Sequence, residues 1–345
     1  MKCAVLQDTG SLGIIQRDDP VCGPYDVVVA VDACGVCRTD RKAFHMGQRD
    51  LVMPRVLGHE IMGHIHQVGA HVNSYHPGQR VQVYPGVVCG QCDNCKSGND
   101  HLCDHMQIIG FHLDGGFAQY VLVQGHHSEP PGINKLPDSL DDASATLAEP
   151  LACSVNMQKR LDVDQAQSMV IFGAGPLGIL SAQLARNLGA QRIIIVEPME
   201  ARRKIARQFS DYQLDFDDNT VSSLLDLTHN RGADVVLPCC PGNDAFLMGL
   251  ECAAKRGRVG FFCGLTDTDS LTNHAFNIIH YRELTLVGAY GCSSADNRMA
   301  LDLLVTHKVS RDKVPSLDIS WDQLPAILSN LDPAEHVFTF FYPTR

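Results

Sequence analysis

Basic residues are scarce in this sequence. It has 28 Lys and Arg against 39 Asp and Glu, which gives a formal net charge of −11. Nucleic acids and anionic membranes attract clustered Lys and Arg, and no basic run occurs, so we predict neither partner. No apolar run approaches the roughly 20 residues that span a bilayer. Repeats and low-complexity segments are missing as well.

A secretory signal is also missing. The opening residues, MKCAVLQDTGSLGI, turn polar at Gln7, which leaves an apolar stretch too short for a signal peptide. Without such a signal, the 14 cysteines are better explained as thiols and metal ligands in a reducing compartment than as disulfides. We therefore expect a soluble cytoplasmic protein. Its 345 residues suffice for two domains.

The pattern of the chain changes along its length. Up to about residue 125, short β-like runs such as 27–31 and 80–84 alternate with turn formers, which is typical of a β-rich domain. Helical patterning begins near Asp141, a candidate N-cap. From Ser168 strands and helices alternate, which predicts a doubly wound parallel sheet and an α/β fold. The expected strands are 168–172, 192–197, 233–240, 257–264 and 284–291, and the expected helices are 176–190 and 199–209.

A glycine-rich turn joins the first of these strands to the first helix. Its sequence, GAGPLG, fits the G-x-G-x-x-G pattern, and its position between strand and helix is the one that dinucleotide binding requires. Glycines permit a tight turn, and a pyrophosphate can rest on the N-terminus of the helix. A helix-packing turn in a protein that binds no nucleotide is the alternative. The predicted cofactor contacts are Gly173, Gly175, Pro176, Leu177 and Gly178.

Glu197 ends the next strand, 19 residues after Gly178. A carboxylate at this point can accept hydrogen bonds from both ribose hydroxyls of NAD and would repel the extra phosphate of NADP. We therefore predict NAD as the preferred cofactor. Arg202 and Arg203 follow on the next helix and could swing toward a 2′-phosphate. Solvated helix surface is the interpretation we favour for both, with Arg202 counted among the residues near the cofactor.

Four cysteines fall within fifteen residues, at intervals of three, three and eight. A redox motif needs only one C-x-x-C pair beside a βαβ unit, whereas this cluster lies well before the α/β region. Four thiolates, with Gly90 and Gly98 to bend the loop, predict a tetrahedral zinc site with no open position, and hence a structural one. Unrelated free thiols are the alternative. The predicted ligands are Cys89, Cys92, Cys95 and Cys103.

Three other segments carry possible ligands for a second metal. They are CGVCRTD with Cys37, GHE with His59 and Glu60, and AEPLAC with Glu149. A catalytic zinc usually keeps three protein ligands and one open position, and Cys37, His59 and Glu149 would make such a set. Each residue alone also has a structural explanation, as a buried thiol, a hydrogen-bonded histidine or a carboxylate at a helix start.

Together these motifs resemble the zinc-dependent medium-chain dehydrogenases, and most closely the sorbitol (polyol) dehydrogenase-like branch. The resemblance runs through nearly the whole chain and is highly specific. It rests on residues 37–40 (CRTD), 58–60 (GHE), 114–118 (DGGFA) and 149–151 (EPL), on the four cysteines and on the glycine turn. It implies a GroES-like catalytic domain (1–150 and 291–345, with the structural zinc lobe at 89–103) interrupted by a Rossmann NAD-binding domain (151–290).

The resemblance also implies roles for the candidate ligands. Cys37 and His59 match the first two ligands of the catalytic zinc. Glu149 falls where other alcohol dehydrogenases of the family place a cysteine. In the sorbitol-like branch Glu60 can enter the coordination sphere and the later glutamate can act through water, so either glutamate could touch the metal.

Further roles concern the proton relay beside the metal. Asp40 matches the carboxylate that orients the ligating histidine, and Thr39 matches the hydroxyl that passes on the substrate proton. Lys42 stands where the family often has a histidine, and His45 comes three residues later, so water could complete the relay. Arg38 could contact the cofactor pyrophosphate or be a surface charge.

The activity implied by the resemblance is a zinc-dependent, NAD-linked interconversion of a secondary alcohol and its ketone. A small polar alcohol, such as a polyol, sugar acid or cyclitol, is the expected substrate, and a homodimer or homotetramer is the expected assembly. A threonine-type amino-alcohol dehydrogenase is the alternative enzyme. A non-catalytic NAD-binding protein of the same fold is the alternative outside catalysis.

Overall fold

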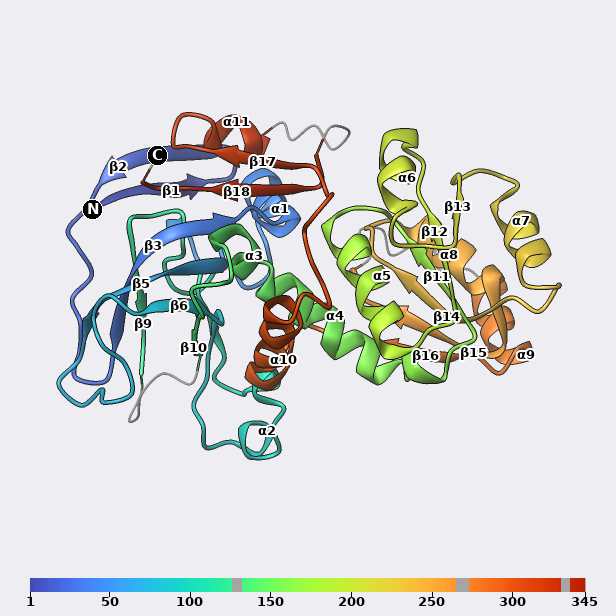
Figure 1. Ribbon diagram of the computed structural model, residues 1–345, viewed down its shortest axis with the longest axis horizontal. Coiled ribbons are helices and arrows are strands. Elements are labelled where there is room, and N and C mark those ends of the chain that lie inside the picture. Colours follow the sequence, from blue (N-terminus) through green and yellow to red (C-terminus); the bar gives the residue numbers. More distant parts are fainter. Residues whose placement is uncertain (126–131, 265–272, 330–335, 345) are drawn as a thin grey trace. The chain divides into compact units, whose positions relative to one another are not determined.

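The computed structural model in Figure 1 describes residues 1–125, 132–264, 273–329 and 336–344. The chain forms two compact units. Among the described residues, unit 1 contains Met1–Ala152 and the C-terminal residues from Cys292 onward except His336 and Val337, which belong with Cys153–Gly291 to unit 2. None of the 14 cysteines forms a disulfide.

Unit 1 is built on a seven-stranded sheet. Its strands run in the order β10-β6-β5-β3-β18-β17, and β9 also pairs with β3. The predicted run 27–31 lies in β3 and the predicted run 80–84 corresponds to β6, which ends one residue earlier at Val83, so both are confirmed as strands. The bounds are β3 (Val27–Gly35), β5 (Glu60–Val68), β6 (Arg80–Val83), β9 (Tyr120–Val123), β10 (Ile133–Lys135), β17 (Ser316–Ile319) and β18 (Phe338–Phe341).

Two smaller sheets complete the β structure of unit 1. The first has the order β2-β1-β4 and the second pairs β7 with β8. Their bounds are β1 (Lys2–Asp8), β2 (Ser11–Gln16), β4 (Arg55–Val56), β7 (Gly86–Val87) and β8 (Gln107–Ile108). The largely aliphatic core of unit 1 contains a group of aromatic rings: the Phe341 ring lies 5.6 Å from Phe117 and 4.9 Å from Trp321, both edge to face. Burying each such ring stabilises the fold by roughly 1.5–3 kcal/mol.

The helix predicted from Asp141 is present but interrupted. The Asp141 carboxylate accepts a hydrogen bond from the N–H of Ser144 at 3.1 Å, which confirms the cap. The first helix, α3 (Asp142–Thr146), then ends, and α4 (Ala148–Arg160) begins. Pro150 explains the break, because it has no N–H to donate to the carbonyl of Thr146. The other helices of unit 1 are α1 (Arg38–Met46), α2 (Asp93–Lys96), η1 (Asp100–Leu102), α10 (Ser294–Val305) and α11 (Leu324–Ser329).

Unit 2 is a six-stranded sheet in the order β13-β12-β11-β14-β15-β16, and every neighbouring pair is parallel. The chain starts in the middle, runs out to β13, returns to β14 beside β11 and runs out to β16. This is the doubly wound Rossmann order, with its switch point between β11 and β14. The bounds are β11 (Ser168–Phe172), β12 (Arg192–Val196), β13 (Tyr212–Leu214), β14 (Ala233–Pro238), β15 (Ala253–Phe261) and β16 (Thr285–Gly288).

Five strands of unit 2 correspond to the predicted apolar runs, and β13 has no predicted counterpart. Several ends differ: β12 ends one residue early at Val196, β15 ends three early at Phe261, and β16 covers only 285–288 of the predicted 284–291. β14 stops at Pro238, two residues before the predicted end, and β15 starts at Ala253, four residues before its predicted start. All five residues of β11 are buried, as expected for a central parallel strand. The helices are α5 (Pro176–Leu188), α6 (Glu200–Ala206), α7 (Thr220–Leu227), α8 (Asn243–Cys252) and α9 (Asn273–Tyr281), with the short η2 (Val163–Gln165) before β11.

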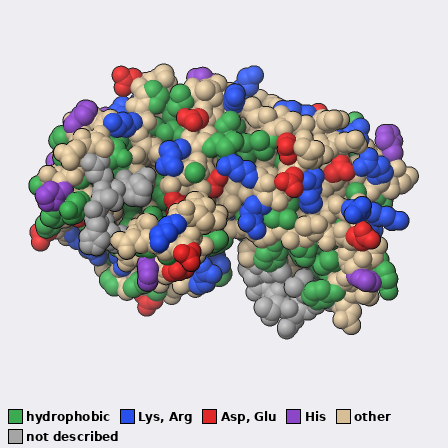
Figure 2. Space-filling view, turned by 90° about the horizontal axis from the view of Figure 1, so that it is seen from below, with side chains coloured by type: hydrophobic (Ala, Val, Ile, Leu, Met, Phe, Trp, Pro, Cys, Tyr) green, Lys and Arg blue, Asp and Glu red, His purple; other side chains and the backbone are tan. Residues whose placement is uncertain are grey.

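Basic and acidic side chains are interspersed on the face shown in Figure 2, so this face carries no patch of a single charge. Across the described ranges, no helix combines the length and the apolar character that a membrane crossing needs.

Candidate functional site

Cys37 lies at the N-cap of α1. Its sulfur accepts a hydrogen bond from the N–H of Thr39 at 3.4 Å, and the Asp40 carboxylate accepts one from the N–H of Cys37 at 2.9 Å. These two bonds form a capping box, which fixes both side chains at the first turn. The positive end of the helix dipole also favours negative charge on the sulfur.

His59 and Glu60 reach the same place from the start of β5. The ligand atoms of Cys37, His59 and Glu60 all lie within 4.8 Å of one another. Asp40 is fully buried, and its Oδ1 lies 3.4 Å from Nδ1 of His59. Because a ligating histidine is typically oriented by a carboxylate at its other nitrogen, this arrangement leaves Nε2 for a metal. Sulfur, imidazole and carboxylate are the donor set that zinc prefers.

Gly35 makes room for Glu60, and sequence reasoning missed it. In the β3–β5 register Gly35 pairs with Glu60, and a Cβ on Gly35 would lie 1.9 Å from Oε2 of Glu60. No side chain fits there while the carboxylate keeps its position. A glycine inside a strand can mark such a close approach, so the run DACGVC contained the signal. The Phe111 ring, 5.0 Å from that of His59, has no comparable signal in the sequence.

The metal-free cluster holds protons tightly. The pKa of Glu60 is raised to about 8, chiefly by burial and also by the charges of Glu149 and Asp40, with His59 acting in the opposite direction. Burial also raises the pKa of Cys37, against the influence of His59. A cation would replace these protons and relieve the cost of burying the charges. Such strongly perturbed groups gather at functional sites more often than elsewhere.

Glu149 lies outside this group of three. It is buried in the first turn of α4, and its carboxylate lies within 4.8 Å of the Cys292 thiol. Its charge still raises the pKa of Glu60, so the two carboxylates interact electrostatically. Of the two glutamates considered from the sequence, the structure groups Glu60 with Cys37 and His59.

Of the candidate relay residues, Thr39 lies near Cys37 and His45 does not. The Thr39 hydroxyl is 3.6 Å from the Cys37 sulfur. Lys42 is exposed. His45 lies at the other end of α1, where its Nε2 is 3.2 Å from the Ser329 carbonyl in α11. His45 therefore contacts α11, at the opposite end of α1 from Cys37. Arg38 is exposed on the first turn of α1.

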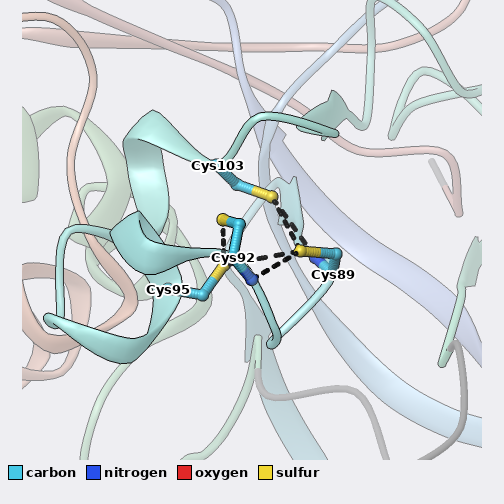
Figure 3. Close-up of side chains that lie close together, drawn as sticks. All are labelled: Cys89, Cys92, Cys95 and Cys103. Carbon is cyan, nitrogen blue, oxygen red and sulfur yellow. Dashed lines mark hydrogen bonds between the residues drawn. The ribbon is translucent and has the colours of Figure 1, made fainter.

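The four-cysteine cluster converges on one point (Figure 3). Its sulfur–sulfur separations are 3.5 Å for Cys92–Cys95 and Cys89–Cys103 and 4.0 Å for Cys89–Cys95. Four sulfurs bound tetrahedrally to zinc at about 2.3 Å lie about 3.8 Å apart. The cluster therefore fits a zinc ion with no ligand position left for substrate.

Backbone groups prepare this cluster for negative charge. The N–H groups of Gln91 and Cys92 point at the Cys89 sulfur, at 3.5 and 3.4 Å, and lower the pKa of Cys89 to about 6. Gly90 and Gly98, predicted to bend the loop, have φ of +69° and +80°. Glycine adopts such angles without strain, so the loop can close around the sulfurs.

The glycine turn of unit 2 has the backbone geometry of a dinucleotide site. Gly173 has a φ of +101° directly after β11, and Gly175 and Pro176 are the N-cap and first residue of α5. A Cβ on Gly178 would lie 1.9 Å from the Gly173 carbonyl oxygen. The turn thus needs its glycines, and the free N–H groups of α5 point to where a pyrophosphate would bind.

Glu197 is attached to this turn. Its Oε2 accepts a hydrogen bond from the N–H of Ala174 at 2.7 Å, and its Oε1 accepts one from Met199 at 3.0 Å. Each carboxylate oxygen has a second lone pair, so ribose hydroxyls can still bind. A Cβ on Gly175 would lie 3.5 Å from Nη1 of Arg202, so Arg202 borders the turn.

The structure corrects our prediction for Arg203. We favoured solvated helix surface, but its side chain is only 19% exposed and its Nη2 lies 3.0 Å from Asp215. Its Nη1 donates to the carbonyls of Glu197 and Pro198 at 2.6 and 2.7 Å. Arg203 therefore ties the end of β12 to the loop that follows β13. Sequence position alone cannot reveal that partner.

Comparisons with known proteins agree with this site and fold. Residues 23–133 match the family described as alcohol dehydrogenase GroES-like domain, and residues 176–306 match the family described as zinc-binding dehydrogenase. The chain is 32% identical to a sorbitol dehydrogenase of Halalkalibacterium halodurans over 309 residues, which cover 88% of this chain and 87% of that protein. It is 31% identical to an L-threonine 3-dehydrogenase of Pyrococcus abyssi over 314 residues, covering 86% and 87%.

A solved structure shows the same fold over the full length. The NADP-bound structure of a protein from Sinorhizobium meliloti 1021 matches with a TM-score of 0.89 at 29% identity and covers 99% of each chain. The fold and the donor sets define a metal-dependent dehydrogenase. The chain belongs to the zinc-dependent medium-chain alcohol dehydrogenases, and the predicted GroES-like and Rossmann fold is confirmed. The family and its dehydrogenase relatives support an enzyme over our non-catalytic alternative.

Proposed function

We propose that this enzyme interconverts a secondary alcohol of a polyol, sugar acid or cyclitol and the corresponding ketone, with NAD as hydride carrier. The observation that supports the proposal most strongly is the group of Cys37, His59 and Glu60, with Asp40 behind the histidine. A zinc ion bound there supplies a Lewis acid that lowers the pKa of the substrate hydroxyl.

The protein's own groups have separate tasks in this scheme. Cys37 and His59 hold the metal, with Glu60 as the third ligand and Glu149 as the nearby alternative. Asp40 keeps Nδ1 of His59 protonated and the ring oriented. Thr39 receives the substrate proton and passes it outward through water, because His45 is occupied by α11.

NAD is proposed as the preferred cofactor because Glu197 places a negative charge beside the glycine turn. Arg202 borders the same turn and is the residue that could soften this preference. The kcat/KM values for NAD and NADP measure the balance directly. If the two kcat/KM values are comparable, the preference for NAD is refuted. In that case Glu197 does not discriminate between the cofactors, and Glu197→Gln should leave the ratio of the two values unchanged.

The relatives divide on substrate, since the similar proteins include a sorbitol and an L-threonine 3-dehydrogenase at almost equal identity. We favour a polyol-type substrate because flanking hydroxyls suit a polar pocket. A panel of alditols, sugar acids, cyclitols and threonine, followed by NADH absorbance, separates the two. Turnover of threonine alone would reject the polyol proposal.

We also propose that residues 1–150 and 291–345 form the catalytic domain and residues 151–290 the NAD-binding domain. A cytoplasmic homodimer or homotetramer is the assembly we propose. The edge strand β16 supports it, because Leu286 is 43% exposed there and an unpaired edge can join a second copy. Sedimentation of the purified enzyme tests the assembly.

A further inference from the structure

Three cysteines that the proposed function does not use gather at the carboxyl edge of the six-stranded sheet. Cys239 and Cys240 directly follow β14, and Cys263 lies two residues beyond β15. In the parallel register of these strands Val236 pairs with Val259. Cys240 and Cys263 each lie four residues beyond that pair, two residues past the ends of β14 and β15, at the same edge of the sheet.

The same edge carries the glycine turn. The N–H of Cys239 donates to the Phe172 carbonyl at 2.8 Å, which extends the pairing of β14 with β11. A Cβ on Gly173 would lie 3.4 Å from the Cβ of Cys240. Cys240 therefore borders the first glycine of the turn, at the switch point where doubly wound sheets bind ligands.

Cys239 differs from its two neighbours. Its sulfur lies 3.7 Å from the Ser181 hydroxyl in α5. Burial raises the pKa of Cys239 well above its usual value, and the nearby Cys263 raises it further. Only the thiolate is a good nucleophile, so we expect Cys239 to be inert. All three cysteines are half-buried, and none is in a disulfide.

We propose that Cys240 and Cys263 form a thiol-modification site through which small disulfides, such as glutathione disulfide, block dinucleotide binding. This inference rests on the proposed NAD site. The Cys240 thiolate, after losing its proton to solvent, attacks one glutathione sulfur; that S–S bond breaks and one glutathione thiolate leaves. The Cys263 thiolate then attacks the Cys240 sulfur and releases the second glutathione. Two protein thiols are oxidised and one disulfide is reduced.

Both products of this exchange interfere with the turn. A disulfide needs Cα atoms about 4.4–6.8 Å apart. Neighbouring parallel strands lie about 4.8 Å apart, so a continuation of the β14–β15 register past Val236 and Val259 would meet that condition. The bond ties Cys240 to the segment after β15 while it rests against Gly173, the first glycine of the turn that leads into α5. The mixed disulfide places a whole tripeptide over the same turn.

The test is NADH binding by the zinc-loaded full-length protein, measured by fluorescence before and after treatment with glutathione disulfide. We expect the Kd for NADH to rise about tenfold or more and to recover with dithiothreitol. Mass spectrometry should find the Cys240–Cys263 cross-link. Failure of the untreated protein to bind NADH would refute the proposed function, whereas normal binding that treatment leaves unchanged would refute the thiol site.

Variants separate the roles, each compared with its own untreated sample. Cys240→Ser should lose the response, and Cys263→Ser should trap glutathione on Cys240. Cys239→Ser and the matched control Cys22→Ser, a half-buried thiol in unit 1, should respond like the parent. Zinc is quantified throughout, because treatment could also oxidise the four-cysteine cluster. A response that survives in Cys240→Ser, or that follows zinc loss, overturns the proposal.

A second measurement needs no variant. Iodoacetamide labelling of Cys240 in the parent enzyme, followed by mass spectrometry, should slow about tenfold under saturating NADH. Labelling at the same rate with and without NADH would show that Cys240 does not border the bound cofactor and would refute the site.

Discussion

Unit 1 contains two groups of side chains that could each hold a metal ion, and they are built in opposite ways. The four cysteines come from fifteen consecutive residues, and backbone N–H groups surround their sulfurs. Cys37, His59 and Glu60 come from a helix cap and the start of a strand, and Asp40 and the missing side chain of Gly35 support them. The first group is closed by four equivalent donors, whereas the second has three unlike donors.

This difference separates holding a shape from doing chemistry. Four thiolates satisfy a tetrahedral zinc and leave no position for substrate. Three mixed donors leave one coordination position open. Because the group is buried, the charge on a metal there would act strongly on a substrate bound at that position. A zinc ion would thus stabilise the fold in the four-cysteine group and act as a Lewis acid in the mixed group.

Removing a ligand from the mixed group should have the largest effect on activity. We expect His59→Ala to lower kcat/KM by about 1000-fold or more, because the metal that polarises the substrate is lost. NADH binding should remain. The matched control is His66→Ala, an exposed histidine on the same strand. Near-normal turnover by His59→Ala in protein shown to lack this metal would contradict the assignment.

Removing a ligand from the four-cysteine group should instead act on stability. We expect Cys95→Ser to lower the free energy of unfolding by more than about 4 kcal/mol, since metal binding contributes directly to folding. Denaturant unfolding measures it, with Cys22→Ser as control. If Cys95→Ser lost turnover at unchanged stability, this group would not be a structural one.

The pH dependence of zinc binding should also distinguish the groups. The pKa of Glu60 is raised to about 8, so the metal-free cluster holds that proton at neutral pH and zinc displaces it. Affinity should therefore rise with pH, and the slope of log K against pH should fall by about one near pH 8. Competition with a chromophoric chelator measures it. Glu60→Gln should abolish this change of slope, and its persistence would assign the proton elsewhere.

Two glycines offer the finest comparison. Gly35→Ala forces Glu60 away, so we expect weaker zinc binding and about a tenfold loss of kcat. Gly90→Ala meets no atom within 4 Å and suffers only from its positive φ, so a cost of about 1 kcal/mol in stability with normal kcat is expected. Steady-state kinetics and unfolding of both variants decide. Equal kcat values would show that the space at Gly35 is unimportant.

Local patterns carried most of the sequence-based prediction. Strands such as β11 are continuous buried runs, the glycine turn lies between strand and helix, and the four cysteines are neighbours in the chain. Partners distant in sequence could not be found this way. The Gly35–Glu60 contact, the Arg203–Asp215 pair and the Ser329 carbonyl beside His45 all depend on which elements the fold brings together.

The pairing of β18 with β3 has a consequence for biosynthesis. Residues near position 340 complete a sheet that begins near position 30, with Phe341 opposite Cys34. The continuous segment of unit 2 can fold while the ribosome is still working, but unit 1 must wait for the last residues to emerge. The core of unit 1, including the Phe341 ring, is thus assembled late, and we expect chaperones to bind this unit of the nascent chain first.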